Sequence, residues 1–229
     1  MATAETRSRP VSRREREREI VEATRQLFDE RGLQDAPIDE IARAVGINRA
    51  LIYRHFASKE ELFIAAVTSY LYELEGRAPE PDPDADAVEL LRAACENYVS
   101  FCLEYPAFLD CSLSLMRRPA RELRAMVSDA VWLRLGRSMA SCLAMLARVL
   151  ELGRERGVFA IEDPDFTANH LYTQVLGTMH LARIQVGVRE LSAGVPDAFP
   201  IDPQRVRRAA VEDAMALARI RPAAAAGGS

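Results

Sequence analysis

The sequence contains few of the residues on which metal centres and disulfide frameworks depend. It has three histidines and four cysteines, and none of the cysteines shows the C-x-x-C spacing of a zinc site. His170 and His180 are too far apart in sequence to share a metal ion on adjacent helical turns, so we expect no metal and no cofactor. The cysteines lie in apolar stretches with helical spacing and are expected to be buried free thiols: Cys95, Cys102, Cys111 and Cys142.

Signatures of catalysis, secretion and membrane insertion are missing as well. There is no Gly-rich phosphate loop and no nucleophile elbow, so we do not expect an enzyme. The N-terminus is rich in arginine and lacks the apolar core of a signal peptide. The longest charge-free run, residues 166–182, is too short and too polar for a membrane span. We therefore expect a cytoplasmic protein.

No long segment alternates apolar and polar residues, which disfavours β-sheet. Apolar residues instead recur every three or four positions, and hydrophobic residues make up 49% of a 25.5 kDa chain. This pattern predicts an all-α globular protein with a sizeable core. The expected helices cover residues 12–31, 37–45, 49–56, 59–75, 85–104, 108–116, 120–156 with a bend near 128–129, 164–186 and 203–220. Residues 187–200, rich in Gly and Pro, are expected to form a loop.

The segment from residue 46 to residue 62 is the most informative part of the chain. Gly46 suits a turn, where a positive φ is required, and Asn48 suits the N-cap of a helix beginning at the next residue. Ser58 is followed three positions later by Glu61, which is the capping-box pattern for another helix start. The segment therefore predicts a turn, a short helix, a cap and a second helix.

The short helix divides its residues between two faces. Ile52 and Phe56 lie four positions apart and share an apolar face, whereas Arg49, Tyr53 and Arg54 point elsewhere. Two amphipathic helices precede it, and a tight turn separates the second from the third. This arrangement predicts a helix-turn-helix unit whose third helix suits the groove of a nucleic-acid duplex.

These residues resemble the N-terminal domain of the TetR family of bacterial transcriptional regulators. The likeness extends over about residues 18–67, and the matching residues are Ala23, Phe28, Ile41, Ala42, Gly46, Ile47, residues 53–56 and residues 58–62. The resemblance implies a homodimer whose two helix-turn-helix heads bind a palindromic operator. It also implies an α-helical C-terminal domain with a pocket for an inducer.

The domain organisation follows from the motif and from the prolines. The linker over residues 76–84 contains three prolines and is not expected to be helical. We expect an N-terminal arm and helix-turn-helix domain over residues 1–58 and a connecting helix over 59–75. A helical domain for ligand binding and dimerisation is expected over 76–221, and a disordered tail over 222–229.

The candidate DNA contacts lie on and around the short third helix: Asn48, Arg49, Ala50, Leu51, Tyr53, Arg54, His55 and Lys59. Tyr53, His55 and Lys59, the only lysine in the chain, fit a phosphate clamp in which hydroxyl, ring and ammonium donate to phosphate oxygens. The alternative is that Tyr53 packs against the protein and His55 is an ordinary surface residue. Arg49 and Arg54 are expected to reach either base edges or phosphates.

Charge is distributed unevenly along the chain. Residues 1–59 carry 12 basic and 10 acidic residues, whereas the remainder carries 18 basic and 24 acidic residues. A mildly basic N-terminal unit on an acidic body suits a protein that meets phosphates at one end. Arg13, Arg14, Arg16 and Arg18 either touch backbone phosphates or pair with neighbouring glutamates on a solvated helix face.

The C-terminal part contains aromatic and Met residues together with a few polar groups, which is typical of a small-molecule pocket. The same residue types more often form plain core. Asn, Gln and His on the helix over 164–186 are expected to need polar partners if that helix is buried. The candidate pocket residues are Tyr98, Phe101, Cys102, Phe108, Met116, Trp132, Met139, Asn169, Tyr172 and His180.

The last two long helices are expected to form a dimer interface. The helix over 164–186 has apolar residues on two stripes, and the helix over 203–220 has one stripe formed by Val206, Ala210, Ala214 and Leu217. Because one stripe can face the core of its own subunit, the other predicts pairing with a second copy across a two-fold axis.

Two functions from different classes are compatible with the sequence. The first is a DNA-binding regulator, a repressor that binds double-stranded operator DNA as a homodimer and is released by a small apolar molecule. The second is a helical enzyme or binding protein that only carries the N-terminal unit. The absence of catalytic motifs favours the first.

Overall fold

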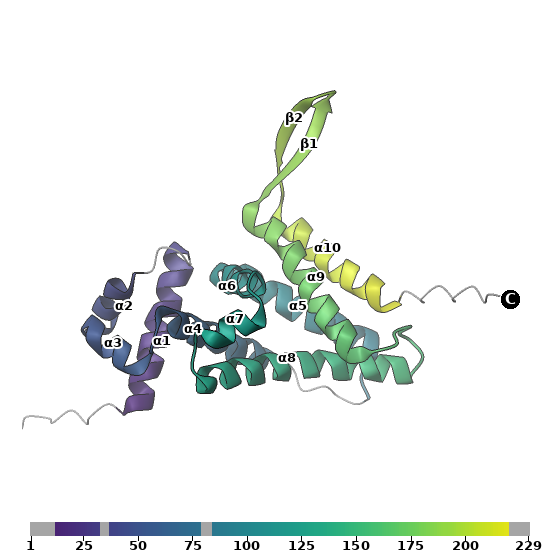
Figure 1. Cartoon of the computed structure of the whole chain (residues 1–229). Coiled ribbons are helices and arrows are strands. Elements are labelled where there is room, and N and C mark those ends of the chain that lie inside the picture. The colour runs from purple at the N-terminus through teal and green to yellow at the C-terminus, as the bar shows by residue number, and fades with distance from the viewer. Residues whose placement is uncertain (1–11, 33–36, 79–83, 220–229) are drawn as a thin grey trace, which may run out of the picture.

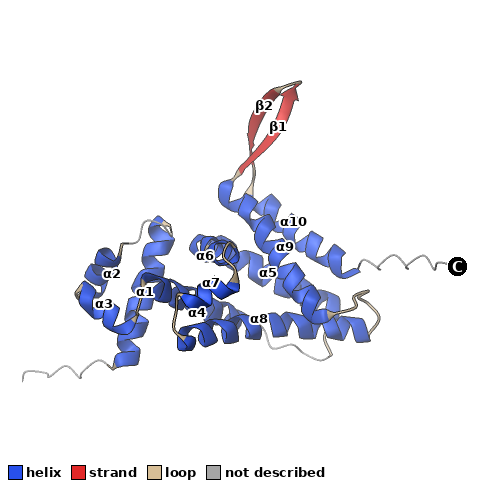
Figure 2. Cartoon of the chain, in the orientation of Figure 1, coloured by secondary structure: helices blue, strands red, loops and turns tan. Residues whose placement is uncertain are grey.

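The computed structural model describes residues 12–32, 37–78 and 84–219, which form ten helices and one β-hairpin (Figures 1 and 2). The expected disordered tail and the centre of the expected proline-rich linker lie outside the described residues. The elements are α1 (Arg13–Arg31), α2 (Ile38–Val45), α3 (Arg49–His55), α4 (Lys59–Arg77), α5 (Ala87–Glu104), α6 (Pro106–Met116), α7 (Ala120–Ala125), α8 (Asp129–Glu155), α9 (Pro164–Ile184), β1 (Val186–Ser192), β2 (Val195–Pro200) and α10 (Pro203–Arg219).

Helices α1, α2 and α3 form a small unit at one end of the molecule (Figure 1). Ser12 and Glu15 build a capping box at the start of α1, and Gly32, at φ 83°, ends the helix as expected. Pro37 was expected at the first helical position of α2, but it is the N-cap, with extended backbone and no side-chain hydrogen bond. Its ring fixes a φ that suits either position, so the sequence alone did not separate the two.

Helix α4 leads from this unit into the body, where it packs against α8 (Figure 1). It continues to Arg77, two residues beyond the expected end, because Arg77 forms ion pairs with Glu73 and Glu104. The expected bend near Ser128–Asp129 is a complete break between α7 and α8, and Ser128 is the N-cap of α8. In the body, α8 packs against α9, and α10 packs against α5 and α9.

The expectation of a loop over residues 187–200 is wrong, because β1 and β2 pair there as an antiparallel hairpin that projects from the body (Figures 1 and 2). Val188 pairs with Ala198 and Glu190 with Pro196, and Gly194, at φ 78°, occupies the turn. Proline is tolerated here because both strands of a two-stranded sheet are edge strands. The Gly and Pro content therefore resembled a loop although the segment is paired.

The apolar stripes proposed for dimerisation face the subunit's own core. Val206, Ala210 and Ala214 of α10 are at most 5% exposed because α10 packs onto α5 and α9. Both apolar stripes of α9 are covered in the same way: Leu171, Val175, Leu176, Met179 and Ala182 are buried, and Tyr172 is half-buried. These residues are therefore unavailable as the partner surface expected from the sequence.

The core is continuous from the N-terminal unit into the body. At its centre Phe101 and Phe108 stack edge to face with ring centroids 5.0 Å apart, and Tyr70 lies against both. The four cysteines are free, as expected, with Cys95, Cys102 and Cys111 buried and Cys142 half-buried. Within the described ranges, none of the helices has the length and apolar character that crossing a membrane requires.

Candidate nucleic-acid interface and ligand cavity

Local sequence explains how α3 is presented. Gly46 adopts φ 71° at the end of α2, and its N–H donates to the carbonyl of Ala42, which reverses the chain within a few residues. The Asn48 side chain accepts a hydrogen bond from the Leu51 N–H at 2.8 Å, which caps the start of α3. Ile52 is 1% exposed and fixes the inner face of α3 against the core.

The outer face of α3 exposes the polar candidates. Arg49, Ala50 and Arg54 are exposed, Tyr53 is 39% exposed, and Leu51 is half-buried. Lys59 is exposed at the first position of α4, a 19-residue helix whose N-terminus favours anions. The structure therefore brings two arginines, a phenol and a lysine to one end of the molecule, where they suit the phosphates and base edges of a duplex.

Arg49 already has neighbours on this face. Its guanidinium lies 5.5 Å from the centre of the Tyr53 ring, and its Nη1 atom lies 3.6 Å from Oδ2 of Asp39. Both members of the ion pair are more than half exposed, and an exposed pair of this kind contributes little. Arg49 can therefore leave Asp39 for a phosphate or a guanine edge at low cost.

His55 is placed differently from the other candidates. Its side chain is 11% exposed, and its Nδ1 atom lies 3.4 Å from Oε1 of Glu17 on α1. The ring therefore fills the contact between α3 and α1, and of the three residues assigned to the phosphate clamp only Tyr53 and Lys59 are exposed. On α1, Arg13 and Arg16 pair with glutamates at 3.0 and 2.7 Å, which favours the solvated-face interpretation for these two.

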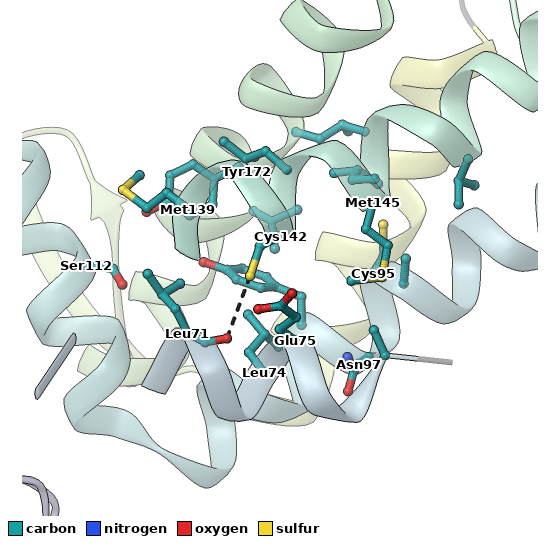
Figure 3. A pocket seen from close by; sticks show the side chains of 18 of the residues that line it. Leu71, Leu74, Glu75, Cys95, Asn97, Ser112, Met139, Cys142, Met145 and Tyr172 are labelled. Carbon is teal, nitrogen blue, oxygen red and sulfur yellow. Dashed lines mark hydrogen bonds between the residues drawn. The ribbon is translucent and has the colours of Figure 1, made fainter. Parts of the chain in front are cut away.

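A partly open cavity of about 140 Å³ lies between α4, α5, α6, α8 and α9 (Figure 3). Its lining is mainly apolar, with few polar groups, which is the usual composition of a small-molecule site. The lining residues are Val67, Leu71, Leu74, Glu75, Ala78, Leu90, Ala94, Cys95, Asn97, Tyr98, Ser112, Leu115, Met139, Cys142, Leu143, Met145, Leu146, Val149, Leu171, Tyr172 and Val175.

Three of the ten candidate pocket residues line this cavity: Tyr98, Met139 and Tyr172. The other seven lie elsewhere. Phe101, Cys102 and Phe108 are core residues at most 2% exposed, Met116 is 46% exposed, Trp132 is half-buried, and Asn169 and His180 are exposed on α9. The Asn169 amide donates to the carbonyl of Asp165 one turn earlier, so its polar group has a partner within its own helix.

Sequence reasoning missed the contribution of α4 to the cavity. Leu71, Leu74 and Glu75 line it from one side, and the Cys142 thiol of α8 donates to the Leu71 carbonyl at 3.7 Å (Figure 3). The Glu75 carboxylate accepts a hydrogen bond from the Ser141 hydroxyl at 2.5 Å. The available signal was Glu75 beside the apolar Leu71 and Leu74, but Glu73 and Arg77 also lie in the last turns of α4, so its meaning depends on where α8 packs.

Glu61 joins the N-terminal unit to the body. Its N–H donates to the Ser58 hydroxyl at 3.1 Å, as expected, but its carboxylate accepts from the Ala57 N–H at 2.8 Å and from the Ser128 N–H at 2.7 Å. Burial of Glu61 opposes ionisation, yet the hydrogen bonds from Ser128 and Ala57 hold its pKa below the usual value. The end of α3 is therefore tied to the start of α8.

A second tie connects α1 to the body through Glu73. Arg25 of α1 lies over the Tyr70 ring at 4.0 Å and donates to Glu73 at 2.5 Å. Tyr105, between α5 and α6, donates to the same carboxylate at 2.7 Å, and Arg77 does so at 2.6 Å. Burial raises the pKa of Glu73, but these three donors outweigh it and lower the pKa from 4.5 to about 2.

The N-terminal unit matches a family model described as bacterial regulatory proteins, tetR family, over residues 20–66. The transcriptional repressor AcnR of Corynebacterium diphtheriae is 30% identical over 177 residues, which cover 75% of this chain and 82% of AcnR. The transcriptional activator FasR of Mycolicibacterium smegmatis is 32% identical over 96 residues, which cover 42% of this chain but only 44% of FasR.

Solved structures share the fold over nearly the whole chain. The TetR-family regulator PfmR of Thermus thermophilus has a TM-score of 0.56 at 23% identity, over 86% of this chain and 97% of PfmR. A TetR-family protein from Rhodococcus has a TM-score of 0.62 at 18% identity, over 90% of this chain and 98% of that chain. The long match to AcnR, the match of residues 20–66 and the shared fold lead to one conclusion: the chain belongs to the TetR family of bacterial transcriptional regulators.

Proposed function

We propose that this regulator is a homodimeric repressor that binds a palindromic operator through α3 and Lys59 and is released when a small molecule enters the cavity. The observation that carries the proposal is the position of α4. Its first residue, Lys59, lies at the exposed cationic face, and its last turns, from Leu71 to Glu75, line the cavity. A ligand in the cavity therefore contacts the helix that presents the DNA-binding unit.

Repression is favoured by the relatives that match over most of their length. The two AcnR proteins, from Corynebacterium efficiens and Corynebacterium diphtheriae, are described as repressors and are covered over 97% and 82% of their chains. The activator FasR is matched over less than half of its length. The proposed domains are residues 1–58 for DNA binding, 59–77 for the connecting helix and 78–221 for the body; the second boundary moves from the expected residue 75 because α4 ends at Arg77.

Dimerisation is proposed through a different face of α9 from the stripes expected from sequence. Phe166, Leu181 and Ile184 are 67%, 41% and 47% exposed, and with the small residue Gly177 they follow one side of the helix. A Cβ atom added to Gly177 would meet nothing within 4 Å, so its own subunit does not need a glycine there. A helix from a second copy can approach closely at that point.

The hairpin extends this exposed surface. Register places Val186, Val188 and Ala198 on one face of the hairpin, where the two valines are 48% and 75% exposed. A lone two-stranded hairpin is marginally stable in water, and its apolar face gains most from a covering surface. The hairpin leaves the body directly after Ile184, so the second copy that covers α9 is the occupant we propose for this face as well.

Selection of bound duplexes from a random pool tests the proposed function. We expect enrichment of a palindrome whose half-sites are about 34 Å apart along the duplex, as required by a two-fold dimer with one head per half-site. A variant with Arg49→Ala and Lys59→Ala should enrich nothing above the background. Enrichment of single, non-repeated sites by the native protein would contradict the proposed dimeric mode of binding.

A further inference from the structure

Glu75 gives the cavity an uneven electrostatic character. Among the described residues it is the sole charged side chain in the lining, which otherwise consists of apolar residues, cysteines, two tyrosines, Asn97 and Ser112. Figure 3 shows its carboxylate in the middle of the lining, beside Cys142. A carboxylate so placed favours a ligand that brings a positive charge or strong hydrogen-bond donors into the cavity.

This carboxylate has a hydrogen-bond donor but no charged partner among the described residues. Its hydrogen bond comes from the neutral Ser141 hydroxyl at 2.5 Å, and within the described residues it forms no ion pair with Arg, Lys or His. The half-buried carboxylate of Glu73, in contrast, is paired with Arg25 and Arg77. A carboxylate beside an apolar cavity is costly unless a cation neutralises its charge or water solvates it.

The tyrosines add a second feature that suits a cation. Tyr98 and Tyr172 both line the cavity, with ring centroids 6.1 Å apart and planes at 68°. Ring faces attract organic cations, and Met139 and Met145 add polarisable sulfur atoms to the same lining. Aromatic side chains together with one carboxylate form a lining that favours cations over anions.

We propose that the cavity binds an amphiphilic organic cation, whose ammonium group pairs with Glu75 and whose apolar body lies against Tyr98, Tyr172 and the side chains of α8. This inference rests on the proposed ligand-responsive function and specifies the chemical class of the ligand. An anionic amphiphile of the same shape meets repulsion from Glu75, and a neutral one gains the apolar contacts alone. Glu75 therefore predicts the order of affinity for amphiphiles of one shape: the cation binds most tightly, the neutral molecule less tightly and the anion most weakly.

Calorimetric titration of the full chain with octylammonium, 1-octanol and octanoate tests the ranking, because the three share one apolar body. We expect octylammonium to bind at least about tenfold more tightly than octanol, as a charge-assisted hydrogen bond within a cavity does, and octanoate to bind most weakly. Octanoate binding as tightly as octylammonium, or no binding by any of the three, would overturn the proposal.

Variants assign the preference to Glu75. Glu75→Gln should reduce octylammonium affinity to that of octanol and leave octanol binding unchanged, whereas Glu75→Asp should retain the preference. The control is Glu96→Gln, which removes an exposed carboxylate of α5 outside the cavity and should change nothing. Survival of the preference in Glu75→Gln, with thermal unfolding like that of the native chain, would also overturn the proposal.

The outcome is separable from that of the proposed function. Operator binding without any preference for octylammonium leaves the DNA-binding role intact and removes the ligand class. If the protein prefers octylammonium as predicted but binds no selected duplex, the ligand class is supported and the proposed function is contradicted.

Discussion

At the residue scale, Lys59 carries the clearest electrostatic expectation. It is the only lysine of the chain and is exposed at the start of α4, where the helix dipole also favours a phosphate. Lys59→Ala should weaken binding to all duplexes alike and reduce the slope of log affinity against log salt by about two, because each of the two subunits loses one phosphate contact. Fluorescence anisotropy over a salt series measures this slope.

Two comparisons complete the Lys59 experiment. Arg148→Ala, an exposed charge of α8 outside the DNA-binding unit, should leave the slope unchanged. Arg49→Ala should instead cost roughly 1–3 kcal/mol in each half-site of the preferred sequence and relax the preference at one base pair of each half-site, if Arg49 reads a guanine. A Lys59→Ala protein with the native salt slope would show that this residue does not touch phosphate.

A second residue, Glu73, predicts how the stability of the fold depends on pH. Its pKa is about 2 in the folded protein against an ordinary 4.5, so its ion pairs stabilise the fold above about pH 4.5 and this contribution is lost as the pH falls toward 2. Glu73→Gln should therefore lower stability at neutral pH and flatten the fall in stability between those pH values. Chemical unfolding monitored by circular dichroism at several pH values measures the stability at neutral pH and its fall toward pH 2. If Glu73→Gln lost stability with falling pH as steeply as the native protein does, this account would be contradicted.

At the element scale, Gly177 tests the proposed dimer face of α9. A Gly177→Arg substitution places a long charged side chain where the monomer has open space, so it should keep the monomer folded and weaken dimerisation. The matched control is Gly136→Arg on α8, because a Cβ added at Gly136 also meets nothing within 4 Å. Sedimentation at micromolar protein distinguishes monomer from dimer.

The same measurement examines the hairpin. Val188→Asp places a charge on its exposed apolar face and should also weaken the dimer if the second copy covers that face. If Gly177→Arg dimerised with native affinity, α9 would pair through another surface. If Val188→Asp dimerised with native affinity, the hairpin would lie outside the interface.

Elements with local signals were predictable, and those that depend on distant partners were not. Asn48 and Ser58 are N-caps as the sequence indicated, because a cap depends on residues within one turn. The hairpin was missed because its pairing joins two short segments whose Gly and Pro content resembles a loop. On α9 both apolar stripes are covered, and the exposed side, around Gly177, has too few apolar residues to be recognised from periodicity.

At the scale of the whole molecule, α4 and two ties connect the DNA-binding unit with the cavity. Glu61 links the end of α3 to Ser128, and Arg25 of α1 shares Glu73 with Tyr105. Helix α4 also supplies Glu75 to the cavity. The location of the cavity was not predictable from sequence, because it lies where five helices meet, and most candidates chosen by residue type proved to be core or surface.

The central claim is that occupation of the cavity and binding of DNA oppose each other. The affinity of the native protein for its selected operator, measured with and without saturating octylammonium, tests it most directly. We expect the ligand to weaken operator binding by roughly 5–150-fold, the usual range of coupling, and the operator to weaken octylammonium binding by the same factor. An operator affinity that stays unchanged while calorimetry shows the cavity saturated would contradict the account.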